Sequence, residues 1–305
     1  MKAYIARRLL YAAFVLLGVS IIVFFLVRLT GDPAGLMMPL DATAEDVARM
    51  RRALGFDRPL PIQYADFLIR ALQGDFGTSI RHQQPAMGMV LGRLPATLQL
   101  MGMALFVALI IAVPLGILSA LYPNSFIDRF GVVMALVGQA VPNFFLGIVL
   151  ILFFSVQMNL LPSSGRGGIE HLLLPAVTLG TASAAFINRL LRSSLREVLG
   201  TDYIRTARAK GRSRREIVFH HALRNAAIPV VTVIGLQIVQ LVGGAIVTET
   251  VFAYPGAGLL LVQSLGNRDI PVIQAFVLLI AVVVIVVNLV IDLLYGWLDP
   301  RISLT

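Results

Sequence analysis

The sequence predicts an all-α polytopic membrane protein with six transmembrane helices. Three observations predict this class. Hydrophobic residues make up 58% of the chain and charged residues only 13%, and the mean hydropathy is +0.86. Several apolar runs reach the roughly 20 residues that a helix needs to cross the hydrocarbon core of a bilayer. Open strands would leave backbone polar groups unpaired in lipid, so we expect helices.

Six apolar runs are long enough to span a membrane. The first is too long for the core of a signal peptide and is not followed by a small-residue cleavage site, so we expect it to stay in the protein. The six predicted spans are Leu9–Leu29, Thr97–Leu121, Phe130–Phe154, Leu172–Leu191, Ala226–Thr248 and Val272–Trp297.

The distribution of Lys and Arg predicts the orientation. Basic residues collect beside short loops on the cytoplasmic side of membrane proteins. A cytoplasmic N-terminus places most of the 25 basic residues inside, including all of those between Arg189 and Arg224, and leaves only Arg166 and Arg268 in the two short outer loops. The prediction is therefore that both termini are cytoplasmic (N-in, C-in).

The segment 30–96 is the long first outer loop, and its pattern predicts two short amphipathic helices. Thr43 with Asp46 three residues later is typical of a capping box, and Gly55 offers a helix end. A second helix is expected from Pro61 to Gly74. Such helices could lie on the bilayer surface or meet an external protein, and periodicity does not separate these alternatives.

The segment 192–224 is the longest inner connection and is dense in Arg and Lys. Arg205, Arg208 and Arg212 share one face of a helix, whereas Ala207 and Gly211 fall on a neighbouring face. Attraction to anionic lipid explains the charge, but not the spacing of the small residues. Small side chains allow a second surface to approach closely, and Gly211 can also end the helix.

The stretch from Asp202 to Val231, "DYIRTARAKGRSRREIVFHHALRNAAIPVV", resembles the cytoplasmic coupling loop of ABC importer permeases of the dipeptide, oligopeptide and nickel class. The wider superfamily pattern is Glu-Ala-Ala, three residues, then Gly. When that Gly is aligned with Gly211, only Ala207 matches the triplet, and this departure resembles the peptide class. Further segments resemble the B-type permease subunit of this class along nearly the whole chain: "RRLL", "GVS" and "GDPA", "LGFDRPLPIQY", "GDFGTS", "RLPATLQL", "LPAVTLG", "VFAYPGAG" and "NLVIDLLYGWLDPRI".

This resemblance implies a type I ABC importer permease fold and a division of the chain into three parts. These are residues 1–29, with the first transmembrane helix; 30–96, a periplasmic loop; and 97–305, a five-helix core that includes the cytoplasmic coupling loop 192–224. It also implies a multi-pass protein of the bacterial or archaeal inner membrane.

The same resemblance implies partners and cargo. The partners are a C-type permease subunit, two ABC ATPases, an external solute-binding protein and membrane lipid, with no nucleic acid. Members of the class carry dipeptides, longer peptides, glutathione, nickel chelates or sugars, and we expect short peptides here. The residues expected to dock on the ATPase are Asp202, Tyr203, Arg205, Thr206, Ala207, Lys210 and Gly211.

The sequence offers no machinery for ATP hydrolysis or other catalysis. A P-loop needs Gly-Lys-Ser/Thr, but Lys2 and Lys210 are the only lysines and neither follows a glycine. We therefore expect no cofactor, metal or catalytic residue in this chain, and expect ATP and Mg²⁺ to be bound by the partner ATPases. With no cysteine in the chain, thiolate sites are excluded.

Polar residues inside the predicted spans are candidates for the translocation path or its gate. Polar side chains in a membrane are costly and often functional. An equally open alternative is that Asn288 and Asp292, four residues apart, only hold the bundle together. The candidates are Gln139, Asn143, Glu249, Asn288 and Asp292.

Two other functions and two other sites are weighed against these. An ion-coupled secondary carrier would be expected to show inverted repeats and mid-membrane ionisable groups, and a membrane enzyme would need a nucleophile with a base; neither pattern is evident. His220 and His221 point about 100° apart on a helix and cannot readily share a metal. Ser163-Ser164-Gly165 lacks the nucleophile elbow of a serine hydrolase.

Overall fold

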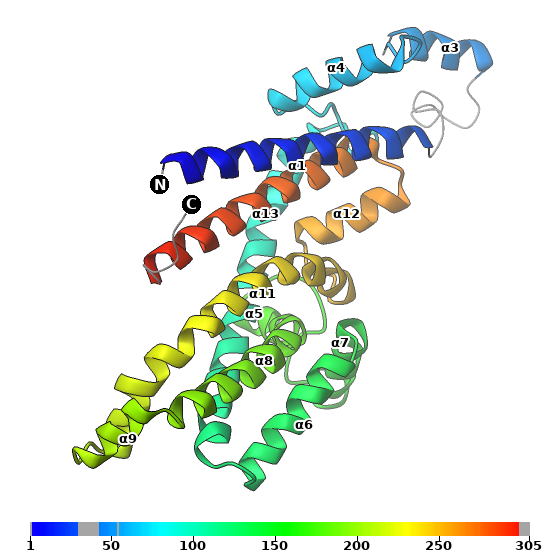
Figure 1. Cartoon of the computed structure of the whole chain (residues 1–305). Helices are drawn as coiled ribbons and strands as arrows, with labels where there is room; N and C mark the ends of the chain where they lie inside the picture. The colour runs from blue at the N-terminus through cyan, green and yellow to red at the C-terminus, as the bar shows by residue number, and fades with distance from the viewer. Residues whose placement is uncertain (1, 30–42, 54, 299–305) are drawn as a thin grey trace. The chain divides into compact units, whose positions relative to one another are not determined.

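A computed structural model describes residues 2–29, 43–53 and 55–298 of the chain. These residues are almost entirely helical, and the only strand-like pairing among them is an isolated bridge between Thr78 and Pro85. The described residues form two compact units, one built from residues 2–29, 43–53, 55–95 and 259–286 and the other from 96–258 and 287–298. The element order can be followed by colour in Figure 1.

Five helices among the described residues are long and apolar enough to cross a membrane. The predicted all-α membrane fold is thereby confirmed, although the helices extend beyond the predicted spans. They belong to α1 (Lys2–Leu29), α5 (Ala86–Leu121), α8 (Ile169–Leu199), the continuous stretch from α10 (Arg214–Glu216) through η2 (Ile217–Ala222) to α11 (Leu223–Val251), and α13 (Ile270–Leu298).

The third predicted span, Phe130–Phe154, is not a single straight helix. It is divided into α6 (Phe126–Ala140) and a second piece, α7 (Asn143–Leu150) with the π-helix η1 (Ile151–Gln157), and the two pieces are bent by 107°. The break falls at Pro142, and proline disfavours the helical region for the residue before it. Val141 accordingly has φ −80° and ψ 121°.

The two amphipathic helices predicted in the outer segment are present as α3 (Ala44–Ala53) and α4 (Leu60–Leu72). The capping box is confirmed, because the Asp46 N–H donates to Thr43 Oγ1 at 3.2 Å and the Thr43 N–H donates to Asp46 Oδ2 at 3.3 Å. Hydrogen bonds from Thr43 are the main cause that lowers the pKa of the Asp46 carboxyl. Gly55, at φ +71°, follows α3.

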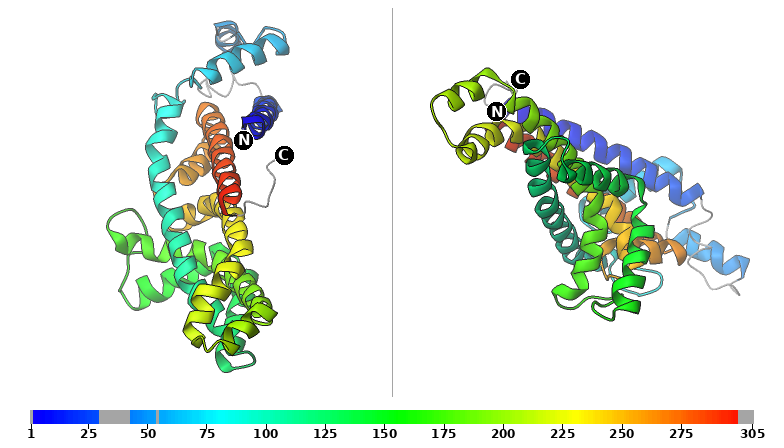
Figure 2. Two further views of the ribbon diagram at one scale, coloured as in Figure 1. Left: turned by 60° about the vertical axis from the view of Figure 1, so that its left-hand side comes forward. Right: turned by 90° about the horizontal axis from the view of Figure 1, so that it is seen from below.

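The core of the 96–258 unit is made where α5, α8 and α11 meet the short helices η2 and α9 (Asp202–Ala209). Small residues allow these helices to approach closely: a Cβ added at Gly180 of α8 would lie 2.5 Å from the carbonyl oxygen of Ala104 in α5. α8 also packs against α6, α7 and α11, as the two views of Figure 2 show for the green and yellow helices. The buried cluster comprises Ala108, Ala112, Ile117, Ala120, Ala184, Ile187, Leu191, Leu195, Ile204, Ile217, Val218, Ala222, Ala226 and Val230.

The inner connection is shorter than the 33 residues expected between 192 and 224. α8 continues to Leu199 and the next helix already begins at Arg214, because the apolar periodicity that buries Leu191 continues to Leu195. Only residues 200–213 connect the two long helices, and α9 occupies most of that length. α12 (Ala257–Gly266) completes the helices of the described chain.

Candidate functional site

α9 is fastened to the rest of its unit by one apolar side. Ile204 is completely buried and belongs to the same cluster as Ile217, Val218 and Ala222. Ala207, one turn later, is half-buried and packs against that cluster. Ala207 therefore packs partly against the chain's own core, and its contact with an ATPase stays a prediction.

The other candidate docking residues lie on the outside of α9 and at its end. Asp202 and Arg205 form an ion pair of 3.1 Å with side chains 93% and 73% exposed. Thr206 Oγ1 donates to the Asp202 carbonyl at 3.0 Å. The exposed candidates are Asp202, Tyr203, Arg205, Thr206, Lys210 and Gly211.

Tyr203 links α9 to the beginning of α11. The side chain of Asn225 donates from Nδ2 to the Tyr203 hydroxyl at 2.8 Å. Since α9 begins three residues after α8 ends, this hydrogen bond and Ile204 tie α9 to both long helices. A displacement of α9 would thus reach α8 and α11 together.

Gly211 ends α9 in the left-handed region, at φ +76°. The Gly211 N–H donates to the Arg208 carbonyl at 3.0 Å, and the Arg212 N–H donates to the Ala207 carbonyl at 3.3 Å. An added Cβ at Gly211 would meet no atom of this chain within 4 Å. Conformation, not crowding within the chain, is what favours glycine here.

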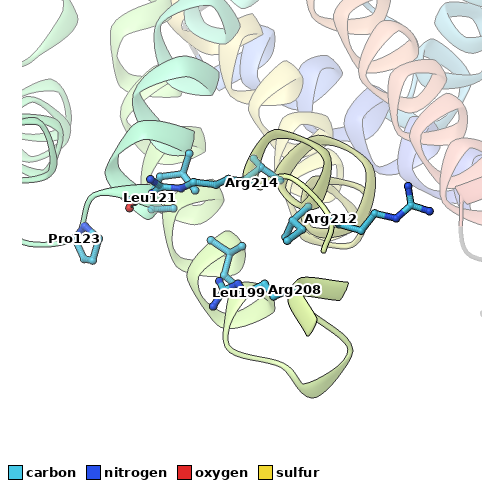
Figure 3. Close-up of a pocket in the computed structure, with 9 residues that line it drawn as sticks. Leu121, Pro123, Leu199, Arg208, Arg212 and Arg214 are labelled. Atoms are coloured by element: carbon cyan, nitrogen blue, oxygen red, sulfur yellow. Dashed lines mark hydrogen bonds between the residues drawn. The ribbon is translucent and has the colours of Figure 1, made fainter. Parts of the chain in front are cut away.

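A groove of about 500 Å³ lies beside α9, and the sequence pattern did not predict it. In Figure 3, Arg214 reaches toward Leu121, whereas Arg212 extends away from it. Arg214 donates to the Leu121 carbonyl at 2.9 Å and so caps the end of α5. The groove combines apolar side chains with three arginine residues, and its lining residues are Ala120, Leu121, Pro123, Leu199, Arg208, Arg212, Arg214, Ile217 and Val218.

A partly buried ion pair joins the beginning of α6 to α8. Asp128 is 3% exposed, and Arg192 donates from Nη2 to Asp128 Oδ2 at 3.0 Å. The Asn124 N–H donates to the same oxygen at 2.9 Å. The sequence did not predict this ion pair, because Asp128 and Arg192 are 64 residues apart.

Gln139 lies beside a cavity of about 130 Å³ between α6 and α8. Gln139 Nε2 and Asn188 Oδ1 are buried and have no hydrogen-bond partner in the described protein. Buried polar groups without a protein partner are commonly hydrogen-bonded by ordered water. The sequence analysis did not select Asn188 as a candidate, although an Asn inside an apolar helix indicates a polar contact in the membrane. Of the five candidate path residues, only Gln139 lines this cavity.

Glu249 is completely buried and organises the loop that follows α11. Thr97 donates from Oγ1 to Glu249 Oε1 at 2.6 Å, and the Ala257 N–H donates to Thr97 Oγ1 at 2.8 Å. A Cβ at Gly256 would clash with the Glu249 carboxyl. Through Thr97, Glu249 therefore joins the end of α11 to α5 and to the beginning of α12.

Tyr254, in the same loop, is also fully buried. Burial raises the pKa of its phenol, so the hydroxyl stays protonated and lies 3.4 Å from Gln99 Oε1. Arg166 donates from Nη2 to that oxygen at 3.1 Å.

The remaining candidates lie apart. Asn143 is half-buried at the beginning of α7 and approaches Gly244 of α11. Asn288 is exposed and Asp292 is half-buried on α13. Among the described residues, no group of three His, Cys, Asp or Glu side chains could hold a metal ion; His220 is exposed and His221 half-buried.

Residues 112–304 match the model of a family described as "Binding-protein-dependent transport system inner membrane component", and residues 1–101 match its N-terminal companion. The chain belongs to this family. Its members lie in the bacterial inner membrane and cross it several times, which agrees with the five long apolar helices and the broken pair.

Relatives of this permease family are similar over their whole length. The glutathione transport system permease protein GsiC of Salmonella typhimurium is 44% identical over 99% of both chains. The oligopeptide transport system permease protein AppB of Bacillus subtilis is 42% identical over 99% of this chain and all of its own. The dipeptide transport system permease protein DppB of Alkalihalophilus pseudofirmus is 38% identical over the same shares.

A solved structure supports the type I importer fold. The membrane subunit of the inward-facing MetNI methionine ABC transporter matches with a TM-score of 0.59 and 23% identity, covering 70% of this chain and 97% of its own. At this identity the match concerns the fold alone. It gives no support to the fold of an ion-coupled carrier, the alternative raised from the sequence.

Proposed function

We propose that this permease is one of two membrane subunits of an ATP-driven importer, and that the importer carries short peptides, a class that includes glutathione. The observation that carries the proposal is the full-length similarity to permeases named for glutathione, oligopeptide and dipeptide transport. The other membrane subunit would be a C-type permease. An external solute-binding protein would deliver the cargo.

The work of hydrolysis belongs to two partner ATPases, which bind ATP and Mg²⁺. This chain has no Gly-Lys-Ser/Thr sequence, and its part is non-catalytic. The membrane orientation is N-in and C-in, which puts α9 and the arginine-lined groove on the cytoplasmic side with the ATPases.

α9 is the element that would receive the motion of an ATPase. Its outer side carries exposed charges, while its inner side is fixed by Ile204 to a core shared with α8 and α11. Closure of the two ATPases would displace α9, and α8 and α11 would follow because the buried contacts join them. Access to the path would then change from the outer to the inner side.

The groove beside α9 supports the same assignment. Arg208 is exposed beside apolar side chains, and such a surface would accept an apolar side chain flanked by acidic ones. Arg214 is already engaged with Leu121, so Arg208 is the guanidinium most available to a partner.

The test is reconstitution of the complete importer in liposomes. We expect peptide uptake that needs ATP and the binding protein, and no uptake driven by a proton gradient when the permease subunits are present alone. Uptake by the permeases alone would contradict the assignment.

Gly211→Leu tests the docking of α9 within that complex. A leucine at φ +76° costs about 1–2 kcal/mol locally, and its bulk would project from the docking surface. We expect coupled transport to fall at least tenfold while membrane insertion is unchanged. Gly211→Asn is the matched control, since Asn tolerates this conformation. Normal transport by Gly211→Leu would contradict the docking role.

A further inference from the structure

α4 has two apolar sides, and the described residues cover only one of them. The covered side packs against α1. Phe24 of α1, 1% exposed, lies with its ring centroid 5.2 Å from that of Tyr64 and 5.8 Å from that of Phe67. Ser20 of α1 and the Tyr64 hydroxyl are hydrogen-bonded at 2.8 Å. α4 is therefore fixed to a defined level of α1.

The second apolar side of α4 is exposed. Ile62, Ile69 and Leu72 are 48%, 56% and 81% exposed, respectively. With Ala65, also exposed, they follow one another at intervals of three, four and three residues, which is one stripe along a helix. We call these four residues the α4 stripe.

Polar residues occupy the rest of the helix. Gln63, Asp66 and Arg70 fall together between the α4 stripe and the side that packs on α1. Arg58 donates to Asp66 at 3.2 Å. α4 thus carries a broad apolar surface and a narrow polar one, which is the distribution of a helix at a membrane interface.

The contacts with α1 set the depth of α4. The apolar window of α1 runs from Ala6 to Leu26, and both Ser20 and Phe24 lie inside it. At 1.5 Å per residue they lie about 9 Å and about 3 Å from the Leu26 end of the window. A helix held at this level is at the edge of the hydrocarbon, not in the water beyond it.

We infer that α4 is an interfacial helix whose stripe is covered by lipid at the outer edge of the bilayer. Most of the apolar window of α1 is itself exposed, so the surroundings of α4 are apolar. α3 differs, because half of its sequence AEDVARMRRA is charged and three of its five apolar residues are alanines, so that it provides no exposed stripe of large apolar side chains. Of the two outer helices, α4 is the one that meets the membrane, and an external protein would meet other parts of the segment 43–85.

Site-directed spin labelling tests this inference on the complete importer in lipid nanodiscs. The wild-type chain has no cysteine, so Ile62→Cys and Ile69→Cys each create a single label site in this subunit, and the labelled wild-type complex serves as the blank. Arg70→Cys, beside Ile69 but on the polar side, is the matched control. The accessibility of each nitroxide to oxygen, which concentrates in lipid, and to a water-soluble nickel chelate is measured by electron paramagnetic resonance.

We expect labels at residues 62 and 69 to relax at least threefold more readily with oxygen than with the nickel chelate, and the label at residue 70 to show the reverse. Ready access of the chelate to all three sites would place α4 in water and overturn the inference. Labels at 62 and 69 that neither reagent reaches would show that protein covers the stripe, which would overturn it as well.

Discussion

The two ends of α11 are fastened by different kinds of contact. At its beginning, α9 is held chiefly by buried apolar side chains, with Ile204 as the largest anchor. At its end, the following loop is held by hydrogen bonds from buried polar groups around Glu249 and Thr97. Apolar contacts have no preferred direction, whereas a buried hydrogen bond is lost when its geometry fails. We therefore expect α9 and the beginning of α11 to be able to shift together as a packed unit. The loop after α11 is expected to keep one arrangement.

The largest effect is expected when the buried apolar side chain that holds α9 at the beginning of α11 is shortened. Ile204→Ala removes a completely buried side chain and is expected to lower the free energy of unfolding by about 3 kcal/mol, with Ile204→Val costing about 1 kcal/mol. Coupled transport should decline in the same order, measured as peptide uptake per ATP hydrolysed. Equal transport by all three proteins would show that α9 does not depend on this anchor.

A smaller effect on stability is expected in the loop after α11, which is held by hydrogen bonds. Glu249→Gln keeps the size of the side chain but replaces a carboxyl oxygen by an amide group, and we expect the free energy of unfolding of the purified complex to fall by about 2 kcal/mol. Thr97→Val is the partner variant, and the double variant should lose clearly less than the sum of the two. Additive losses would mean that the 2.6 Å contact is not what holds the loop.

The smallest effect on stability is expected on the outer side of α9. The Arg205 and Asp202 side chains are largely exposed, so Arg205→Ala should change the free energy of unfolding by about 0.5 kcal/mol or less. Transport should nevertheless fall several-fold if Arg205 meets an ATPase. Arg215→Ala, also exposed but outside the docking set, is the control. Equal transport by the two variants would remove Arg205 from that set.

Local features of the fold were readable from the sequence, and contacts across the fold were not. The capping box of Thr43 and Asp46 depends on two residues three positions apart, and the membrane helices depend on continuous apolar runs. The 107° bend was not predicted, because hydropathy does not fall at Val141, and because a proline alone does not break a helix: Pro175 and Pro229 lie inside continuous helices.

The candidate site shows the same limit. The exposed charges of α9 follow from its composition, but the direction of Ala207 depends on a core contributed by α5, α8 and α11. Asp128 and Arg192 are ordinary loop-flanking charges in the sequence, and only the packing of α6 on α8 brings them together. Whether the polar residues of the spans contact cargo stays a prediction.

The ion pair of Asp128 and Arg192 constrains how the permease can rearrange. Separating the beginning of α6 from α8 would break the hydrogen bonds that Arg192 donates to Asp128, and a hydrogen bond to a charged group contributes about 1.5–3 kcal/mol. We therefore expect α6 and α8 to move together when the permease opens and closes, and the break at Pro142 is the nearest point where the chain can bend.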